Sequence, residues 1–244
     1  MNVTLSLEKT SSSEISIMVD AFRASTSIII AMDNFDEVIP TFSPEKAIEI
    51  AKNRNCVLAG ERMGATLDGF DIGNSPVEIK NYSGEKKKLV LTTSNGTRIL
   101  KNMKSTVLIG AFINAKAVAK AAIEIAEEHS YNHIDVVMAG WKGNFAIEDF
   151  LASGEILYWI ERELDYKKDI NNEDSDSKDK ISEYAQSAIL ANNDYEDVKK
   201  AIYKSRACKG LKKLGFEKDI EFSIQKNVSN NVAIYEDGVL KLIE

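Results

Sequence analysis

The chain has 244 residues, 44% of them apolar, and a formal net charge of −7, which is ordinary for a globular protein with one large domain or two small ones. The acidic balance argues against nonspecific nucleic-acid binding, and the only two cysteines, Cys56 and Cys208, exclude a disulfide framework and a Cys-X-X-Cys metal site. Because there is no signal peptide and no apolar run long enough to cross a bilayer, we expect a cytoplasmic protein with no membrane partner.

Strands and helices alternate through the first half of the chain. Ser43-Pro44 and Ser75-Pro76 each predict a helix start, with serine as the cap and proline as the first helical residue. In the first of these helices we expect Ala47, Ile48 and Ala51 to face inward. The strands are expected at 2–7, 14–19, 37–40, 56–59 and 88–92. Helices are expected at 26–34 and at 44–53. A short helix should begin at Ser75-Pro76, and a further helix should follow the segment 93–98 and run to about 103.

The second half continues the alternation and then changes character. Strands are expected at 106–109 and 134–139, and helices at 114–128 and 144–164. The charge-rich stretch 165–180 is predicted to be a mobile connector. We expect residues 181–244 to form a helical and hairpin segment of one α/β domain that spans 1–244, with helices at 181–191, 194–204 and 206–214 and strands at 231–235 and 239–243 around the turn Glu236-Asp237-Gly238.

This order of elements predicts a three-layer α/β/α fold with a largely parallel or mixed sheet. Ligands of such sheets bind at the carboxyl ends of the strands. Four polar turns directly follow predicted strands, and they converge on one crevice if those strands are parallel neighbours. The turns carry Asp20 and Arg23, Glu61 and Arg62, Thr93–Arg98, and Gly140–Lys142.

Five carboxylates stand in or near these turns and are candidates for a hard metal such as Mg²⁺, which prefers oxygen ligands but takes only one or two carboxylates. We assign Asp20, Glu61 and Glu148 as catalytic candidates, and Asp20, Glu61, Asp71 and Asp149 as metal candidates. The alternative for each is a surface charge or a helix cap, which the helix dipole alone favours near the start of a helix.

Three arginines, Arg23, Arg62 and Arg98, are candidate clamps for oxyanions, because a guanidinium fork matches phosphate, sulfonate and carboxylate groups. Lys142 is a weaker candidate. Hydroxyls and backbone N–H groups of the segment 92–98 predict an anion cradle, the alternative being a well-capped turn. The Cys-X5-Arg spacing of Cys56 and Arg62 resembles cysteine-dependent phosphatases, but Cys56 falls in a predicted buried strand, where a thiol is inert.

Six motifs in order resemble the 2-phosphosulfolactate phosphatase (ComB) family. They run from about Val19 to Gly154, and a weaker similarity resumes at Ser205–Asp219. Residues 64–68 depart from the pattern expected before Gly-Phe-Asp. The motifs are D-A-F-R-A-S-T-S-I, L-A-G-E-R, G-F-D-I-G-N-S-P-V-E, T-T-S-N-G-T-R, G-A-F-I-N-A and A-G-W-K-G-N-F-A-I-E-D.

The resemblance implies a magnesium-dependent phosphatase that hydrolyses (R)-2-phospho-3-sulfolactate to sulfolactate and phosphate in coenzyme M biosynthesis. The expected partner is this small polyanion, and a homodimer is left open. Ser25 and Thr26, which follow the predicted strand 14–19, are added to the residues matched by motif. The candidate substrate-binding residues are then Arg23, Ser25, Thr26, Arg62, Asn74, Ser75, Thr93, Asn95, Gly96, Thr97, Arg98 and Asn114.

We expect direct attack by a water that magnesium positions, with the metal and Arg98 offsetting the phosphoryl charge. Arg23 and Arg62 would hold the sulfonate and carboxylate, and Asp20 or Glu148 would take the proton. A covalent intermediate on Asp20 or Ser25 is the less favoured route. Two other functions stay open: a phosphatase for another 2-hydroxy-acid phosphate, and a non-enzymatic anion-binding protein.

Overall fold

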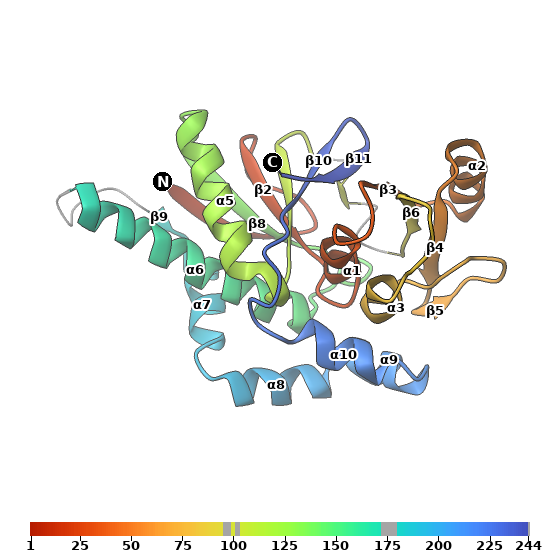
Figure 1. The fold of residues 1–244 in the computed structure, drawn as a ribbon. Helices are drawn as coiled ribbons and strands as arrows, with labels where there is room; N and C mark the ends of the chain where they lie inside the picture. The colour runs from red at the N-terminus through yellow and green to blue at the C-terminus, as the bar shows by residue number, and fades with distance from the viewer. Residues whose placement is uncertain (95–98, 101–102, 172–179, 244) are drawn as a thin grey trace.

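A computed structural model describes residues 1–94, 99–100, 103–171 and 180–243. Its described strands form one eleven-stranded sheet in the order β5-β4-β6-β3-β11-β10-β7-β2-β8-β1-β9 (Figure 1). The strands are β1 (Asn2–Leu7), β2 (Ile15–Val19), β3 (Glu37–Thr41), β4 (Val57–Arg62), β5 (Ala65–Thr66), β6 (Lys88–Thr92), β7 (Thr106–Gly110), β8 (His133–Met138), β9 (Lys180–Ile181), β10 (Ala233–Glu236) and β11 (Val239–Leu242).

Helices flank this sheet, which confirms the predicted three-layer α/β/α class. None of the described helices has the length and apolarity needed to cross a membrane. The helices are α1 (Ala24–Ala31), α2 (Pro44–Arg54), α3 (Pro76–Lys80), the 3-10 turn η1 (Phe112–Asn114), α5 (Ala115–Glu128), α6 (Ile147–Asn171), α7 (Glu183–Ala191), α8 (Tyr195–Lys204), α9 (Arg206–Lys213) and α10 (Glu217–Ser223).

The sheet consists of two groups of strands, and a hairpin joins the groups. Within each group the strands are parallel to one another. One group is β4-β6-β3 and the other is β7-β2-β8-β1-β9. The hairpin β10-β11 lies between them and runs antiparallel to its neighbour on each side, pairing Ile234 with Leu108 and Leu240 with Val38. The four strands that precede the predicted crevice turns are therefore not all parallel neighbours, because the hairpin separates β2 and β8 from β4 and β6.

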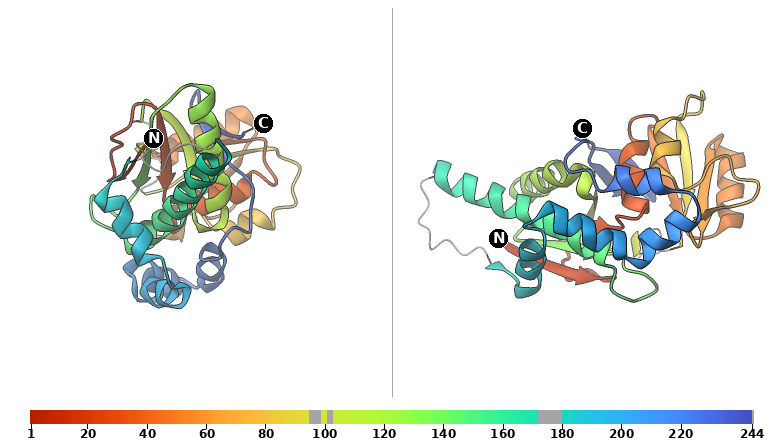
Figure 2. Two further views of the ribbon diagram at one scale, coloured as in Figure 1. Left: turned by 90° about the vertical axis from the view of Figure 1, so that its left-hand side faces the viewer. Right: turned by 90° about the horizontal axis from the view of Figure 1, so that it is seen from below.

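Two buried apolar clusters hold the layers together. The larger cluster packs β1, β2, β7 and β8 against α5, α6 and α7. The other packs α1 and α3 against β3, β4, β6 and β7, and includes Leu240 of the hairpin. Seen from below, α8, α9 and α10 lie across the lower side of the molecule, beneath the sheet (Figure 2). The C-terminal segment thus contributes both a strand pair inside the sheet and a wall beside it.

The local helix signals are confirmed at both Ser-Pro sites. The Oγ atoms of Ser43 and Ser75 accept hydrogen bonds from the backbone N–H groups three residues on, at 3.2 Å each. The inward face of α2 differs from the prediction. Ile48 is 51% exposed, whereas Ile50 and Ala51 pack beside the buried Ala47, because positions three and four residues apart share a helix face.

The long helix α6 extends beyond its predicted end. It runs to Asn171, so residues 165–171 of the expected connector are helical, and its remainder, 172–179, lies outside the described residues. The prediction after this point missed one helix, α10, which begins with Glu217 and ends at Ser223. The wall below the sheet is therefore longer than the sequence pattern indicated.

Candidate active site

Turns that follow the separated strand groups meet at a cavity of about 470 Å³, which we call the site cavity. Asp20 and Arg23 come from the turn after β2, Glu61 from the end of β4, and Glu148 from the start of α6 after β8. Helix α9 closes the cavity opposite these turns. The lining residues singled out from the sequence are Asp20, Arg23, Glu61, Asn74, Thr93, Lys142 and Glu148.

Three carboxylates face the site cavity and are nearly excluded from solvent. Asp20, Glu61 and Glu148 are each 7% exposed. The backbone N–H of Ala24 donates to Oδ1 of Asp20 at 3.3 Å, so the first turn of α1 orients that side chain. The acids predicted to be catalytic are thus assembled by turns from three different strands.

Asp149 lies behind this group and does not line the site cavity. The backbone N–H of Ala21 donates to its Oδ1 at 2.8 Å, and that of Gly140 donates to its Oδ2 at 2.9 Å. The carboxylate therefore fastens the turn after β2 to the turn after β8. The structure thus places Asp149, which was predicted as a metal ligand, outside the lining of the site cavity, with one backbone hydrogen bond on each oxygen.

Burial and mutual repulsion disfavour ionisation of these acids. Burial raises the pKa of Asp149 well above its ordinary value, and the Asp20 and Glu148 carboxylates raise it further, against its two backbone hydrogen bonds. Burial also raises the pKa of Glu148, which hydrogen bonds from its own backbone N–H and Ser205 and the charge of Arg206 oppose. Ionisation of these acids is therefore unfavourable in the folded chain, and a cation beside them would offset that cost.

Glu61 connects the turn after β4 to the segment after β6. Its Oε1 accepts from the backbone N–H of Ser94 at 2.6 Å, and its Oε2 accepts from the backbone N–H of Gly64 at 2.7 Å. Thr93 is 1% exposed and lines the site cavity at the same place. The remaining residues predicted for the anion cradle, Asn95, Gly96, Thr97 and Arg98, lie outside the described residues.

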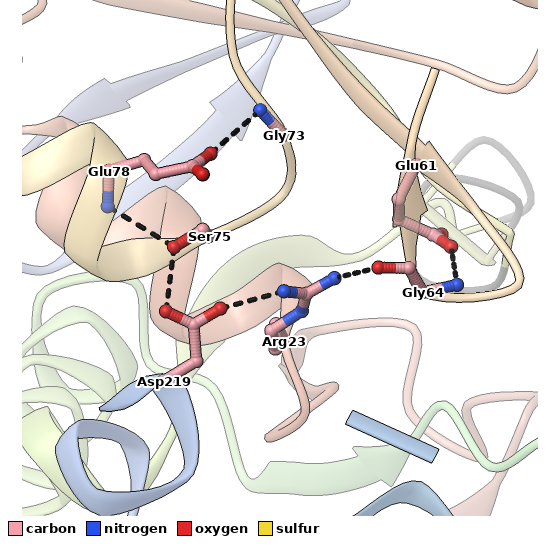
Figure 3. A network of polar contacts seen from close by, with 7 residues as sticks. All are labelled: Arg23, Glu61, Gly64, Gly73, Ser75, Glu78 and Asp219. Atoms are coloured by element: carbon pink, nitrogen blue, oxygen red, sulfur yellow. Dashed lines mark hydrogen bonds and ion pairs between the residues drawn. The ribbon is translucent and has the colours of Figure 1, made fainter. Parts of the chain in front are cut away.

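Arg23 is held from two sides at the wall of the site cavity (Figure 3). Its guanidinium donates to Oδ2 of Asp219 and to the carbonyl oxygen of Gly64, both at 2.7 Å. The other oxygen of Asp219 accepts from Oγ of Ser75 at 2.6 Å. Ser75 was predicted to bind substrate, but it does not line the site cavity and instead caps α3 and holds Asp219.

Two predicted ligands lie away from the site cavity. Strand β4 continues through Arg62, and since successive strand residues point to opposite faces, Arg62 faces away from Glu61. Its guanidinium donates to Thr92 Oγ1 at 3.0 Å and to the carbonyl oxygen of Phe42. Asp71 is exposed, and its carboxylate accepts from the backbone N–H of Leu58 at 2.9 Å. Both predictions are corrected to contacts that hold strand ends.

Three further predicted residues shape the backbone rather than line the site cavity. The Oγ of Ser25 accepts from the N–H of Asp20 at 2.9 Å, and Oγ1 of Thr26 donates to the carbonyl of Ala21 at 3.0 Å. Asn114 is fully buried and donates to the carbonyl oxygens of Ile109 and Asn231. These side chains fix the turn after β2 and the approach of the C-terminal segment to β7.

Comparison with known proteins shows which family this architecture serves. A family model described as 2-phosphosulpholactate phosphatase matches residues 2–238. The chain belongs to the 2-phosphosulfolactate phosphatase family. A 2-phosphosulfolactate phosphatase of Methanothermobacter thermautotrophicus is 45% identical over the whole chain and 96% of the relative, and one of Methanocaldococcus jannaschii is 34% identical over 94% of the chain and 92% of the relative.

A third relative, called a probable 2-phosphosulfolactate phosphatase, comes from Clostridium tetani and is 36% identical over 92% of the chain and 91% of its own length. These matches confirm the family predicted from the six motifs. They also extend across the C-terminal segment, where the motif similarity was weak. Helix α9, which closes the site cavity, and helix α10 after it therefore belong to the matched region of the 2-phosphosulfolactate phosphatase family.

Two residues of this family member that form or support the wall of the site cavity were missed in the sequence. Asp219 pairs with Arg23, and Arg206 lies with its Cζ 4.2 Å from the ring centroid of Trp141. Both residues lie far from the crevice turns along the chain. The one available signal was the weak family similarity over Ser205–Asp219, which did not indicate their contacts.

The donor set of the site cavity suits a hard cation. Among the residues that the structure describes, no group of three or more His, Cys, Asp or Glu side chains is arranged to hold a metal ion. Asp20 and Glu148 both act on Asp149 electrostatically and line the same cavity. One or two carboxylates with no sulfur or imidazole is the set that Mg²⁺ uses when water and substrate oxygens complete its coordination.

Proposed function

We propose that this chain is a magnesium-dependent phosphatase that hydrolyses (R)-2-phospho-3-sulfolactate to (R)-3-sulfolactate and phosphate, a reaction of coenzyme M biosynthesis. The names of its relatives support the substrate. The observation that carries the proposal is the gathering of Asp20, Glu61 and Glu148 with Arg23 and Arg206 around one cavity. A volume of about 470 Å³ lies in the range that accommodates a small ligand.

We propose that Asp20 holds magnesium and that the neighbouring Glu148 stays free to act as the base, because both are buried carboxylates that line the site cavity in front of Asp149. When bound, Mg²⁺ supplies a positive charge that offsets the phosphoryl oxygens and lowers the pKa of a coordinated water. The other groups of the reaction are side chains of this protein. Asp71 and Asp149 are not included, because backbone N–H groups engage them elsewhere.

In the proposed reaction a water oxygen forms a bond to phosphorus while the bond from phosphorus to the substrate C2 oxygen breaks. Glu148 accepts the water proton, and a proton returns to the leaving C2 oxygen. Burial raises the pKa of Glu148, which makes its carboxylate a stronger proton acceptor than an exposed glutamate. Arg23, held in place by Asp219 and Gly64, donates N–H groups to the developing phosphoryl charge.

Phosphate release from 2-phospho-3-sulfolactate tests this proposal. We expect release with Mg²⁺ and its loss with a chelator. Glu148→Gln should lower kcat by about 10²- to 10⁴-fold, which is typical of losing a general base. The matched control is Lys209→Gln, because Lys209 is exposed on α9 and does not line the site cavity. A chain that binds the substrate but releases no phosphate would contradict the proposal.

The stereochemistry at phosphorus separates direct attack from a covalent route. With a substrate whose thiophosphoryl group is made chiral with oxygen isotopes, direct attack by water inverts the configuration at phosphorus, as we propose. A covalent intermediate on Asp20 adds a second displacement at phosphorus and would give retention. Ser25 is a poor nucleophile for that route, because its Oγ is fully buried and engaged by the N–H of Asp20.

A further inference from the structure

Two positively charged side chains approach the same aromatic ring at the site cavity. Nζ of Lys142 lies 4.9 Å, and Cζ of Arg206 4.2 Å, from the ring centroid of Trp141. All three residues line the site cavity. They come from distant parts of the chain, since Trp141 and Lys142 follow β8 and Arg206 begins α9. The fold therefore brings two like charges together on one indole.

This pair of cations differs from the other cation of the site cavity. Arg23 is neutralised by Asp219 in a buried ion pair. In the part of the chain that the structure describes, neither Lys142 nor Arg206 forms an ion pair with a carboxylate. The charge of Arg206 acts on Glu148, whose pKa it lowers against the effect of burial. Two cations that line one cavity without an ion-pair partner favour an anionic ligand in that cavity.

The charges are also distributed along the depth of the site cavity. The carboxylates Asp20, Glu61 and Glu148 are buried, whereas Lys142 and Arg206 are exposed. A substrate whose phosphate is held among the acids with a metal ion would therefore place its remaining anionic groups toward these cations. In 2-phospho-3-sulfolactate the carboxylate, phosphate and sulfonate belong to three consecutive carbons. All three anionic groups therefore fit within one small cavity.

We propose that Lys142 and Arg206, both lying against Trp141, form the subsite that binds the substrate sulfonate and so determine specificity; this rests on the function proposed above. The planar guanidinium fork donates to two oxygens of one oxyanion at once. Contact with the indole orients the guanidinium and lysine charges by cation–π attraction. This subsite replaces the predicted role of Arg62, whose guanidinium points elsewhere.

The test compares two substrates that differ in the sulfonate alone: 2-phospho-3-sulfolactate and 2-phospholactate. Arg206→Gln should lower kcat/KM for the sulfonated substrate by about tenfold or more, mainly through KM, because it removes a charge-assisted contact. It should change kcat/KM for 2-phospholactate much less, and Lys142→Gln should act in the same direction. Arg206→Lys, which keeps the charge, should restore part of the preference. Lys209→Gln removes an equal charge from the same helix and should leave the preference unchanged.

Equal losses on both substrates, or no loss on either, would overturn the sulfonate subsite while leaving the phosphatase proposal standing. If the wild-type chain hydrolyses neither substrate, the proposed function fails instead. Calorimetric titration with 3-sulfolactate then tests the subsite alone. Weaker binding by Arg206→Gln than by Lys209→Gln supports the subsite, and equal binding overturns it. Circular dichroism of each variant verifies that it is folded.

Discussion

Arg23 and Asp219 form an ion pair in which each side chain is 2% exposed to solvent. Removing two charges from water is costly, and hydrogen bonds to Gly64 and Ser75 offset part of that cost. The guanidinium also lies over the ring of Phe216, 4.4 Å from its centroid. At the scale of single residues, this pair connects the turn after β2 to α10 and fixes one donor group at the wall of the site cavity.

Asp219→Asn should lower the free energy of unfolding by about 3–5 kcal/mol, because the buried charge of Arg23 loses its counter-charge while the volume is unchanged. Urea denaturation measures this difference. Ser75→Ala is the matched control, since it removes the other hydrogen bond to Asp219 together with the cap of α3 and should cost only about 1–2 kcal/mol. A loss for Asp219→Asn no larger than that of Ser75→Ala would show that the ion pair is not important for stability.

At the scale of elements, α6 and α7 approach each other closely at Gly154. A Cβ atom added there would lie 2.2 Å from the carbonyl oxygen of Ala188, so only glycine permits this approach. Helix α6 carries Glu148 in its first turn. The packing of its middle against α7 therefore helps to hold the active-site end of the helix in place.

Gly154→Ala should destabilise the protein by about 1–3 kcal/mol, because α7 must shift to relieve the overlap. Gly210→Ala makes the same change in helix α9, where nothing lies within 4 Å of the added Cβ. That variant should gain up to about 1 kcal/mol, since alanine favours the helical state. Urea midpoints of the two variants give the comparison. If both shift in the same direction, the close approach of α6 and α7 is not what glycine provides at position 154.

Elements with local signals were predictable from the sequence. The Ser-Pro starts of α2 and α3 and the final hairpin lie within about two residues of their predicted places, and so do the buried strands except the end of β4. The insertion of β10-β11 between β3 and β7 was not predictable, because such pairing joins strands far apart in the chain. Helix α6 continues past Leu164 into a stretch where Tyr166 and Ile170 are exposed, so no inward apolar face marks the end of the helix in the sequence.

The candidate site was predictable only as far as strand ends indicate it. Asp20, Glu61 and Glu148 follow strands and were found in this way. Arg62 was misplaced because β4 is longer than predicted, and one extra strand residue reverses the face of the next side chain. Arg206 lines the site cavity, and Asp219 holds the lining residue Arg23, through tertiary packing of α9 and α10, for which no local pattern exists.

At the scale of the whole molecule, an acidic chain concentrates three carboxylates, Asp20, Glu148 and Asp149, where its two parallel strand groups and the C-terminal wall meet. Burial and repulsion raise the pKa of Asp149. The folded state therefore holds a proton to higher pH than the unfolded chain does. The stability of the metal-free protein should fall as pH rises from the ordinary pKa of aspartate, about 4, through the raised value.

Magnesium should reverse this dependence if Asp20 holds it. The ion binds the ionised carboxylates, so it should raise the thermal midpoint more at about pH 8 than at about pH 5. Differential scanning calorimetry with Mg²⁺ or a chelator at both pH values measures this. Asp20→Asn removes one of the charges that raise the pKa of Asp149. This variant should therefore show a flatter pH dependence and little response to Mg²⁺. Equal stabilisation by Mg²⁺ at both pH values, or an unchanged response in Asp20→Asn, would show that the ion binds elsewhere.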